Sequence, residues 1–71
     1  MLPLSTAPAG KALTISKITG SDEIRRHLAE LGLVVDSEVE ILKSLDGDLI
    51  LRLNETRLAI SRELGDLVMV D

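Results

Sequence analysis

The side chains that could do chemistry in this chain are few, and the only histidine, His27, comes first. It lies in a stretch with helical periodicity, about 60° from the centre of the apolar stripe. A metal ion bound there would need two or three further nitrogen, sulfur or oxygen ligands. The chain has no cysteine, so carboxylates would have to supply them. His27 is a weak metal candidate, and a semi-exposed helix residue is the simpler interpretation.

Two pairs of carboxylates could also do chemistry. Glu38 and Glu40 project from the same face of an expected strand, and Asp46 and Asp48 flank a glycine. Such pairs can serve as general acid and base or hold a hard cation. Alternating glutamates are, however, typical of a solvated sheet face, and aspartates around glycine are typical of a tight turn. We therefore predict no metal or acid–base site here.

Nucleophilic and phosphate-binding motifs are missing as well. The serines would have to share one histidine, and none lies in a nucleophile-elbow motif. The five glycines are each isolated at an expected element boundary, which indicates turns rather than a phosphate-binding loop. We predict no catalytic residue, no enzyme activity and no cofactor.

The composition indicates how such a small scaffold is held together. The chain has 71 residues, with 14 Leu, 6 Ile and 5 Val but no Phe, Trp, Tyr or Cys. We therefore expect a single domain over residues 1–71 with an aliphatic core and no disulfide. The net charge is −4. Nucleic-acid binding relies on Lys and Arg and often on aromatic stacking, so we expect no nucleic-acid partner.

No segment indicates export or membrane insertion. No Lys or Arg precedes the small residues Ala7-Pro8-Ala9, as a signal peptide would require. The longest apolar run, Leu67–Val70, is far shorter than the roughly 18 residues that span a bilayer. We expect a soluble, cytoplasmic protein.

The first half of the chain predicts a strand and a helix. Residues 1–9 look like a loose N-terminal segment, with Leu2 or Leu4 tucked against the domain. Lys11–Ile18 alternates with strand period and shifts phase near Ser16-Lys17, which predicts a β-bulge.

The expected helix covers Asp22 to Leu31. Ser21 can cap its first turn, and Gly32 can end it in the left-handed conformation. An apolar stripe should hold the helix to the body, and the opposite face should carry ion pairs. The stripe is Ile24, Leu28 and Leu31, and the pairs are Glu23–Arg26 and Arg26–Glu30.

The second half predicts short antiparallel strands. Asp46-Gly47 is a hairpin signal, and Asn54-Glu55 is a second tight connection. Residues 62–66 interrupt the alternation and suggest one helical turn before a last strand over Val68–Val70. The alternating apolar residues are Val39 and Ile41, then Leu49, Leu51 and Leu53, then Leu58 and Ile60. This spacing predicts a mainly β fold, a small barrel of about five antiparallel strands with one short inserted helix.

The segment Arg25 to Val35 is the best candidate for a partner site. Three consecutive apolar residues follow the helix-ending glycine and cannot easily all point inward. One or two of them could form an exposed patch beside two arginines, as partner sites often do. Alternatively, they plug an open end of the barrel. The candidate partner-binding residues are Arg25, Arg26, Leu33, Val34 and Val35.

The order of these motifs resembles a known family. A glycine precedes the first strand, and a helix-to-loop stretch, a hairpin turn and a closing strand follow it. The matching residues are Gly10, Ile15, Ile18, Leu28-Ala29-Glu30-Leu31-Gly32-Leu33, Val39-Glu40-Ile41, Asp46-Gly47-Asp48, Leu58-Ala59-Ile60-Ser61 and Val68-Met69-Val70. Over roughly Leu4 to Asp71 they resemble the FeoA family, small accessory proteins of bacterial ferrous-iron transport, in which an arginine pair often precedes the helix-to-loop stretch.

The resemblance implies an SH3-like β-barrel with an inserted helix. It also implies a cytoplasmic adaptor that binds or regulates the FeoB transporter, a membrane permease with a GTPase domain. Three positions depart from the family. Asp36 and Asn54 stand where glycine is usual, and both tolerate the left-handed conformation. Gly65 stands where alanine is usual, which predicts looser packing before the last strand.

Two alternatives stay open. The related C-terminal SH3-like domain of metal-dependent transcriptional repressors normally follows a DNA-binding and a dimerisation domain. A chain of this length with its own Met1 favours the stand-alone form. The other alternative is a small protein that senses or stores transition metal through His27 and carboxylates. A homodimer is a further possibility, because apolar residues and sheet edges are exposed.

Overall fold

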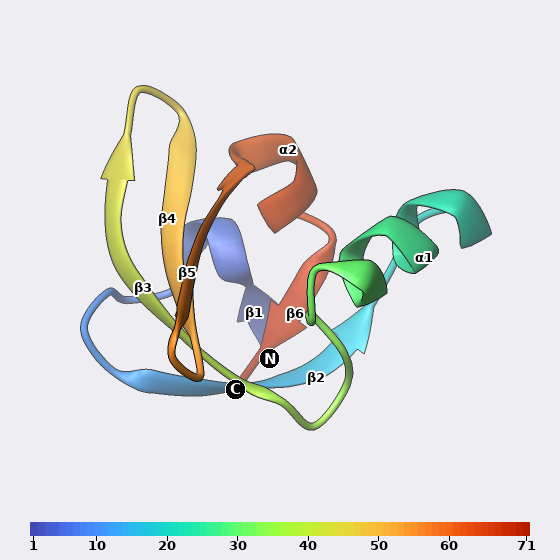
Figure 1. The fold of residues 1–71 in the computed structure, drawn as a ribbon, viewed down its shortest axis with the longest axis horizontal. Helices are drawn as coiled ribbons and strands as arrows, with labels where there is room; N and C mark the ends of the chain where they lie inside the picture. Colours follow the sequence, from blue (N-terminus) through green and yellow to red (C-terminus); the bar gives the residue numbers. More distant parts are fainter.

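The computed structural model describes residues 1–71, folded as one antiparallel sheet with two short helices (Figure 1). The sheet has six strands in the order β1-β6-β2-β3-β4-β5. The elements are β1 (Leu2–Pro3), the 3₁₀ turn η1 (Leu4–Thr6), β2 (Ala12–Ile18), α1 (Asp22–Glu30), β3 (Glu38–Leu45), β4 (Asp48–Leu53), β5 (Thr56–Ser61), α2 (Arg62–Gly65) and β6 (Val68–Val70). The mainly β, SH3-like fold with an inserted helix is confirmed.

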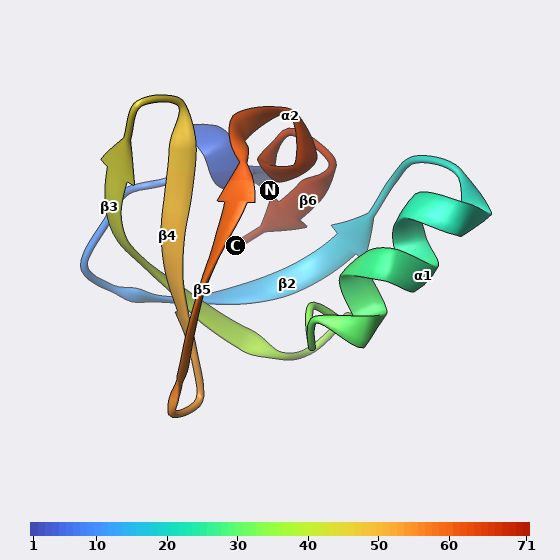
Figure 2. The ribbon, with the colours of Figure 1, turned by 45° about the horizontal axis from the view of Figure 1, so that its top comes forward.

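The strands curl around an aliphatic core, but the sheet keeps two edges. β1 and β5 are its outer strands and do not pair with each other, so the closed barrel of the prediction is not present. α2 and η1 lie between these two edges (Figure 2). The expected bulge is confirmed, because the pairing of β2 with β6 shifts register between Ile15 and Lys17.

The prediction of a loose segment over residues 1–9 is wrong for residues 2–6. Leu2 pairs with Val70 and Pro3 with Met69, which adds a sixth strand to the expected five. Leu4 is fully buried, as one of the two expected anchors. Two residues are too few for an alternation pattern to identify a strand, and the partner strand lies at the other end of the chain.

Local signals set both ends of α1. The Ser21 hydroxyl accepts a hydrogen bond from the Ile24 N–H at 3.2 Å. At the other end Gly32 has φ +97°. Its N–H donates to the Ala29 carbonyl, and the Leu33 N–H donates to the Leu28 carbonyl, both at 2.9 Å. These bonds form a Schellman motif, which satisfies carbonyls that the last turn leaves free.

The helix surface differs from the prediction in two ways. The ion pair on α1 joins Asp22 to Arg25, and neither pair expected at Arg26 forms within 4.0 Å. Leu31 was expected in the buried stripe but is 38% exposed. It is the residue at the C-terminal cap, beyond the last full turn, where the chain already turns away.

The core is entirely aliphatic, as the composition requires. Thirteen hydrophobic side chains are buried, and no polar or charged side chain is buried with them. Most come from the inward faces of the strands, including the predicted leucines of β4. They are Leu4, Leu13, Ile15, Leu28, Leu33, Val39, Ile41, Leu49, Leu51, Leu53, Ile60, Val68 and Val70.

The predicted turns are confirmed, and one packing expectation is wrong. Asp46 and Gly47 have φ +50° and +89°, as the tight hairpin requires. Asp36 and Asn54 both adopt positive φ, so these departures from the family pattern keep the turn geometry. Gly65 is buried, and a Cβ built there would lie 2.6 Å from the Leu49 Cδ1. The packing before β6 is therefore tight rather than loose.

Candidate interaction surface on helix α1 and the following loop

The five candidate partner-binding residues do not all lie on one surface. Arg25 and Arg26 are exposed on α1, and Val34 and Val35 are 41% and 50% exposed in the loop after it. Leu33, in contrast, is fully buried in the core. The assignment of Leu33 to a partner site is therefore wrong for the folded domain. One residue of the apolar segment therefore fills the core and two face solvent, and partner binding by the two exposed valines stays a prediction.

The turn at Gly32 explains this division. A Cβ at Gly32 would lie 2.6 Å from the Leu53 Cδ2, so the backbone at Gly32 packs directly against the Leu53 side chain. This close approach places Leu33 against the core. The following two residues then continue outward in the loop.

The loop that carries Val34 and Val35 is anchored by backbone hydrogen bonds. The Asp36 N–H donates to the Ile15 carbonyl at 2.8 Å, and the Ile15 N–H donates to the Ser37 carbonyl at 2.9 Å. The Ser37 N–H donates back to the Val34 carbonyl at 3.2 Å. Because the loop is already ordered, a partner would lose little conformational entropy on ordering it.

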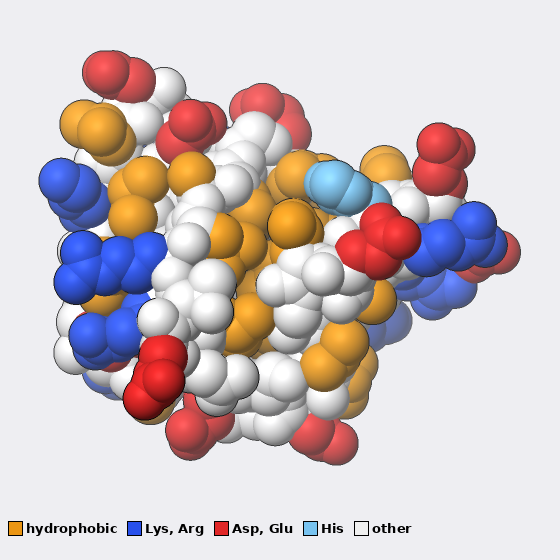
Figure 3. All heavy atoms as spheres, in the orientation of Figure 1, with side chains coloured by type: hydrophobic (Ala, Val, Ile, Leu, Met, Phe, Trp, Pro, Cys, Tyr) orange, Lys and Arg blue, Asp and Glu red, His pale blue; other side chains and the backbone are white.

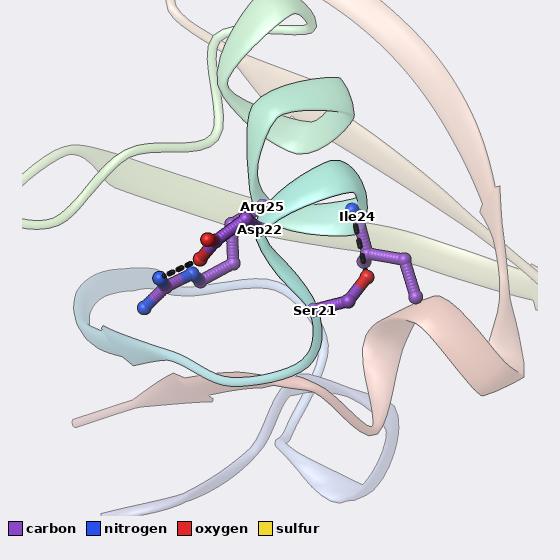
Figure 4. A network of polar contacts seen from close by, with 4 residues as sticks. All are labelled: Ser21, Asp22, Ile24 and Arg25. Carbon is purple, nitrogen blue, oxygen red and sulfur yellow. Dashed lines mark hydrogen bonds and ion pairs between the residues drawn. The ribbon is translucent and has the colours of Figure 1, made fainter.

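Helix α1 projects from the rest of the molecule (Figures 1 and 2). Arg25 lies 2.5 Å from Asp22, and both side chains are more than half exposed (Figure 4). Exposed pairs of this kind contribute less than about 1 kcal/mol to stability. Arg26 has no carboxylate within 4.0 Å and is free to meet an acidic group of a partner.

Leu31 is also exposed beside the loop valines in sequence, although its helical spacing predicts a core position. Together with Val34 and Val35 it makes three of the five large hydrophobic side chains that are exposed in the protein. The signal that could have revealed it is its position beside Gly32, where a Schellman turn leaves the last helical residue outside the stripe. We use the name α1–loop surface for the exposed side chains of α1 and of the loop after it that the partner proposal below uses, which are Arg25, Arg26, Leu31, Val34 and Val35.

The candidate metal-binding residues do not form a cluster. His27 is exposed on α1, and nowhere do three or more His, Cys, Asp or Glu side chains come close enough to hold an ion. The Glu40 carboxylate pairs with Arg52 at 2.5 Å. Glu38 and Glu40 line a shallow depression of about 170 Å³ beside Arg52 and Asn54. Asp46 and Asp48 are exposed at the β3–β4 hairpin.

None of the helices is both long and apolar enough to cross a bilayer.

Known proteins match this chain over nearly its whole length. The FeoA domain family matches residues 2–71. A protein of Methanocaldococcus jannaschii named putative Fe(2+) transport protein A is 25% identical over 71 residues, which is all of this chain and 87% of that protein.

Solved structures agree with this match. A crystal structure described as an iron uptake regulatory protein (FeoA) superposes with a TM-score of 0.90 at 30% identity, over 99% of this chain and 93% of that one. A crystal structure described as ScaR with bound Zn²⁺ gives a TM-score of 0.90 at 15% identity, over 100% of this chain and 36% of that one, and this likeness concerns the fold alone. The resemblance predicted from the ordered motifs is thus confirmed, and the chain belongs to the FeoA family.

Proposed function

We propose that this protein is a cytoplasmic accessory protein of ferrous-iron transport that binds and regulates a FeoB-type membrane GTPase-permease. FeoA proteins are non-enzymatic accessory proteins, which agrees with the predicted lack of enzyme activity. Relatives named for Fe(2+) transport and for iron uptake regulation support the iron-transport part of the proposal.

The observation that carries the binding proposal is the α1–loop surface. It combines exposed Leu31, Val34 and Val35 with two arginines, one of which has no ion-pair partner. Apolar side chains at the centre of an interface with charged groups at its rim are the usual arrangement of partner sites. Because the loop is anchored to β2, this surface is presented in one conformation.

Binding to the purified cytosolic GTPase domain of a FeoB-type transporter, measured by isothermal titration calorimetry, tests the proposal. We expect Val35→Glu and Arg26→Glu each to weaken binding at least tenfold, since the proposed binding site includes both residues. Leu45→Glu is the matched control for Val35→Glu, because Leu45 is equally exposed, at 52%, on the distant β3–β4 hairpin. Lys17→Glu on β2 is the matched charge control for Arg26→Glu.

Two results would contradict the proposal in different ways. Wild-type affinity in both variants would exclude the α1–loop surface as the binding site, but it would not exclude the transporter domain as the partner. Absence of binding by the wild-type protein would exclude the transporter domain as the partner. Circular dichroism of each variant distinguishes lost binding from lost folding.

A further inference from the structure

The outer edge of β5 is a free strand edge. β5 pairs with β4 only, from Leu53↔Thr56 to Asp48↔Ser61, and no strand lies on its other side (Figure 2). Hydrogen bonds of an antiparallel pair alternate between the two sides of each strand. The Arg62 N–H donates to the Gly47 carbonyl, on the side of β4. Because every second residue directs its backbone groups to the same side, the backbone groups of Ile60 and Leu58 also point toward β4. The backbone groups of Arg57 and Ala59 therefore point outward.

Nothing else in the chain takes up these outward groups. Among the backbone hydrogen bonds of turns, loops and caps, none uses a donor or an acceptor within Thr56–Ser61. The other edge strand, β1, has only two residues. β5 is therefore the one long edge on which a further strand could be added.

The side chains beside this edge are basic on the outer face of the sheet. The register places Glu40, Arg52 and Arg57 in one row across three strands. Glu40 neutralises Arg52 at 2.5 Å, whereas Arg57 has no carboxylate within 4.0 Å. Exposed Lys43 lies in the next row. The exposed carboxylates near these rows are Asp46 and Asp48 at the β3–β4 hairpin and Glu55 in the β4–β5 turn. In Figure 3, Lys and Arg side chains gather at the left, on the side of β3 and β4, with acidic side chains close to them.

The inner face of β5 is apolar. Ile60 is buried, and Leu58 is half-buried against the core. A strand added at this edge would therefore meet hydrophobic side chains on one face and a basic side chain on the other. The sheet already contains such a neighbour, because residues 38–41 of β3 read Glu-Val-Glu-Ile and place Glu40 beside Arg52. Arg57 is the next position in that row and has no such neighbour on its free side.

We propose that the outer edge of β5 binds an extended segment of a partner protein, added antiparallel as a seventh strand, in which acidic and apolar residues alternate. Backbone hydrogen bonds to Arg57 and Ala59 supply affinity, and the acidic residue opposite Arg57 supplies specificity. This site lies outside the α1–loop surface and does not depend on the function proposed above.

Charge argues for an acidic segment rather than a second copy of this chain. Two β5 edges paired antiparallel would bring both Arg57 side chains onto one face, within about two residues of each other. Like charges so placed destabilise a sheet, and a charged side chain on an edge strand is a common device against self-association.

A labelled peptide, fluorescein-Glu-Val-Glu-Val-Glu-Val-Glu-amide, tests the proposal by fluorescence anisotropy. We expect saturable binding that Arg57→Glu weakens at least tenfold. Lys17→Glu makes the same change of net charge on β2 and should weaken binding less than twofold. Equal losses in both variants, or no saturable binding up to millimolar protein, would overturn the proposal.

Two further variants test the backbone pairing itself. Ala59→Pro removes only an outward N–H and should weaken binding at least tenfold while the thermal unfolding midpoint stays close to that of the parent. In an antiparallel pair the acidic residue opposite Arg57 points its own N–H at β5. Methylating the Glu nitrogens should therefore abolish binding, and methylating the Val nitrogens should preserve it. Equal binding of the two methylated peptides would refute strand addition.

Two controls separate the remaining explanations. Sedimentation of the unliganded protein should show a monomer, and a dimer that Ala59→Pro dissociates would assign the edge to a second copy and overturn the proposal. Val35→Glu should leave peptide binding unchanged, so that failure at the α1–loop surface and failure at β5 give different results.

Discussion

Replacing Gly32 by alanine tests the turn that divides the apolar segment between core and surface. Gly32 has φ +97°, a conformation that side chains rarely adopt, and a Cβ there would lie 2.6 Å from the Leu53 Cδ2. The substitution therefore combines backbone strain with a steric clash. Gly47→Ala is a matched control, because Gly47 has φ +89° with nothing within 4 Å of a built Cβ.

The two effects can be estimated separately. A non-glycine residue in the left-handed region costs about 1–2 kcal/mol. Overpacking of a tight site costs about 1–3 kcal/mol more. We expect Gly47→Ala to lower the free energy of unfolding by about 1–2 kcal/mol and Gly32→Ala by about 2–5 kcal/mol. For a domain of this size, whose total stability is about 4–11 kcal/mol, the larger value is a substantial part.

Urea unfolding followed by far-ultraviolet circular dichroism measures both costs, since the chain has no aromatic residue for fluorescence. A double-mutant cycle with Leu53→Ala isolates the clash. In that background we expect the cost of Gly32→Ala to fall to the cost of the strain alone. Costs of Gly32→Ala and Gly47→Ala that agree within about 0.5 kcal/mol would refute the close approach to Leu53.

Three further predictions concern the core, the helix cap and metal. Leu33→Ala should lower the free energy of unfolding by about 2–5 kcal/mol in urea titrations, because Leu33 is a core residue; a loss below about 1 kcal/mol would contradict its burial. Ser21→Ala should cost about 0.5–2 kcal/mol by removing the cap at the Ile24 N–H, and Ser21→Gly should cost only a few tenths. Titration with Fe²⁺ under anaerobic conditions should show no binding tighter than roughly millimolar, since no carboxylate cluster surrounds His27; a tighter site lost in His27→Ala would contradict this.

Much of the fold could be predicted because its signals are local. Ser21 and Gly32 mark the two ends of α1 through hydrogen bonds within a few residues. Asp46-Gly47 specifies the hairpin through positive φ at both residues. The alternation in β4 specifies which face is buried, because successive side chains of a strand point to opposite faces.

Two of the mistakes depend on contacts between distant parts of the chain. β1 exists because Leu2 and Pro3 meet Val70 and Met69. The tight packing at Gly65 comes from Leu49 and Ser5.

The candidate site was only partly predictable. Arg25, Arg26, Val34 and Val35 are exposed as the partner hypothesis requires, but periodicity could not decide the places of Leu31 and Leu33. Leu31 is exposed because it caps the helix, whereas the place of Leu33 depends on the packing of the turn at Gly32 against Leu53, which is far away in the sequence. Nor could alternation show that β5 has a free edge, because alternation indicates which face of a strand is buried and not which strands lie beside it.

The amino-acid sequence by itself determined an aliphatic core, antiparallel strands with one capped helix, and membership of the FeoA family, because these follow from composition, period and the order of short motifs. The tertiary structure decided which leucine is core and which is surface, where the sheet ends, and that Arg57 stands unpaired at its long edge. These features arise when distant segments meet, and they are the features with which a partner would make contact.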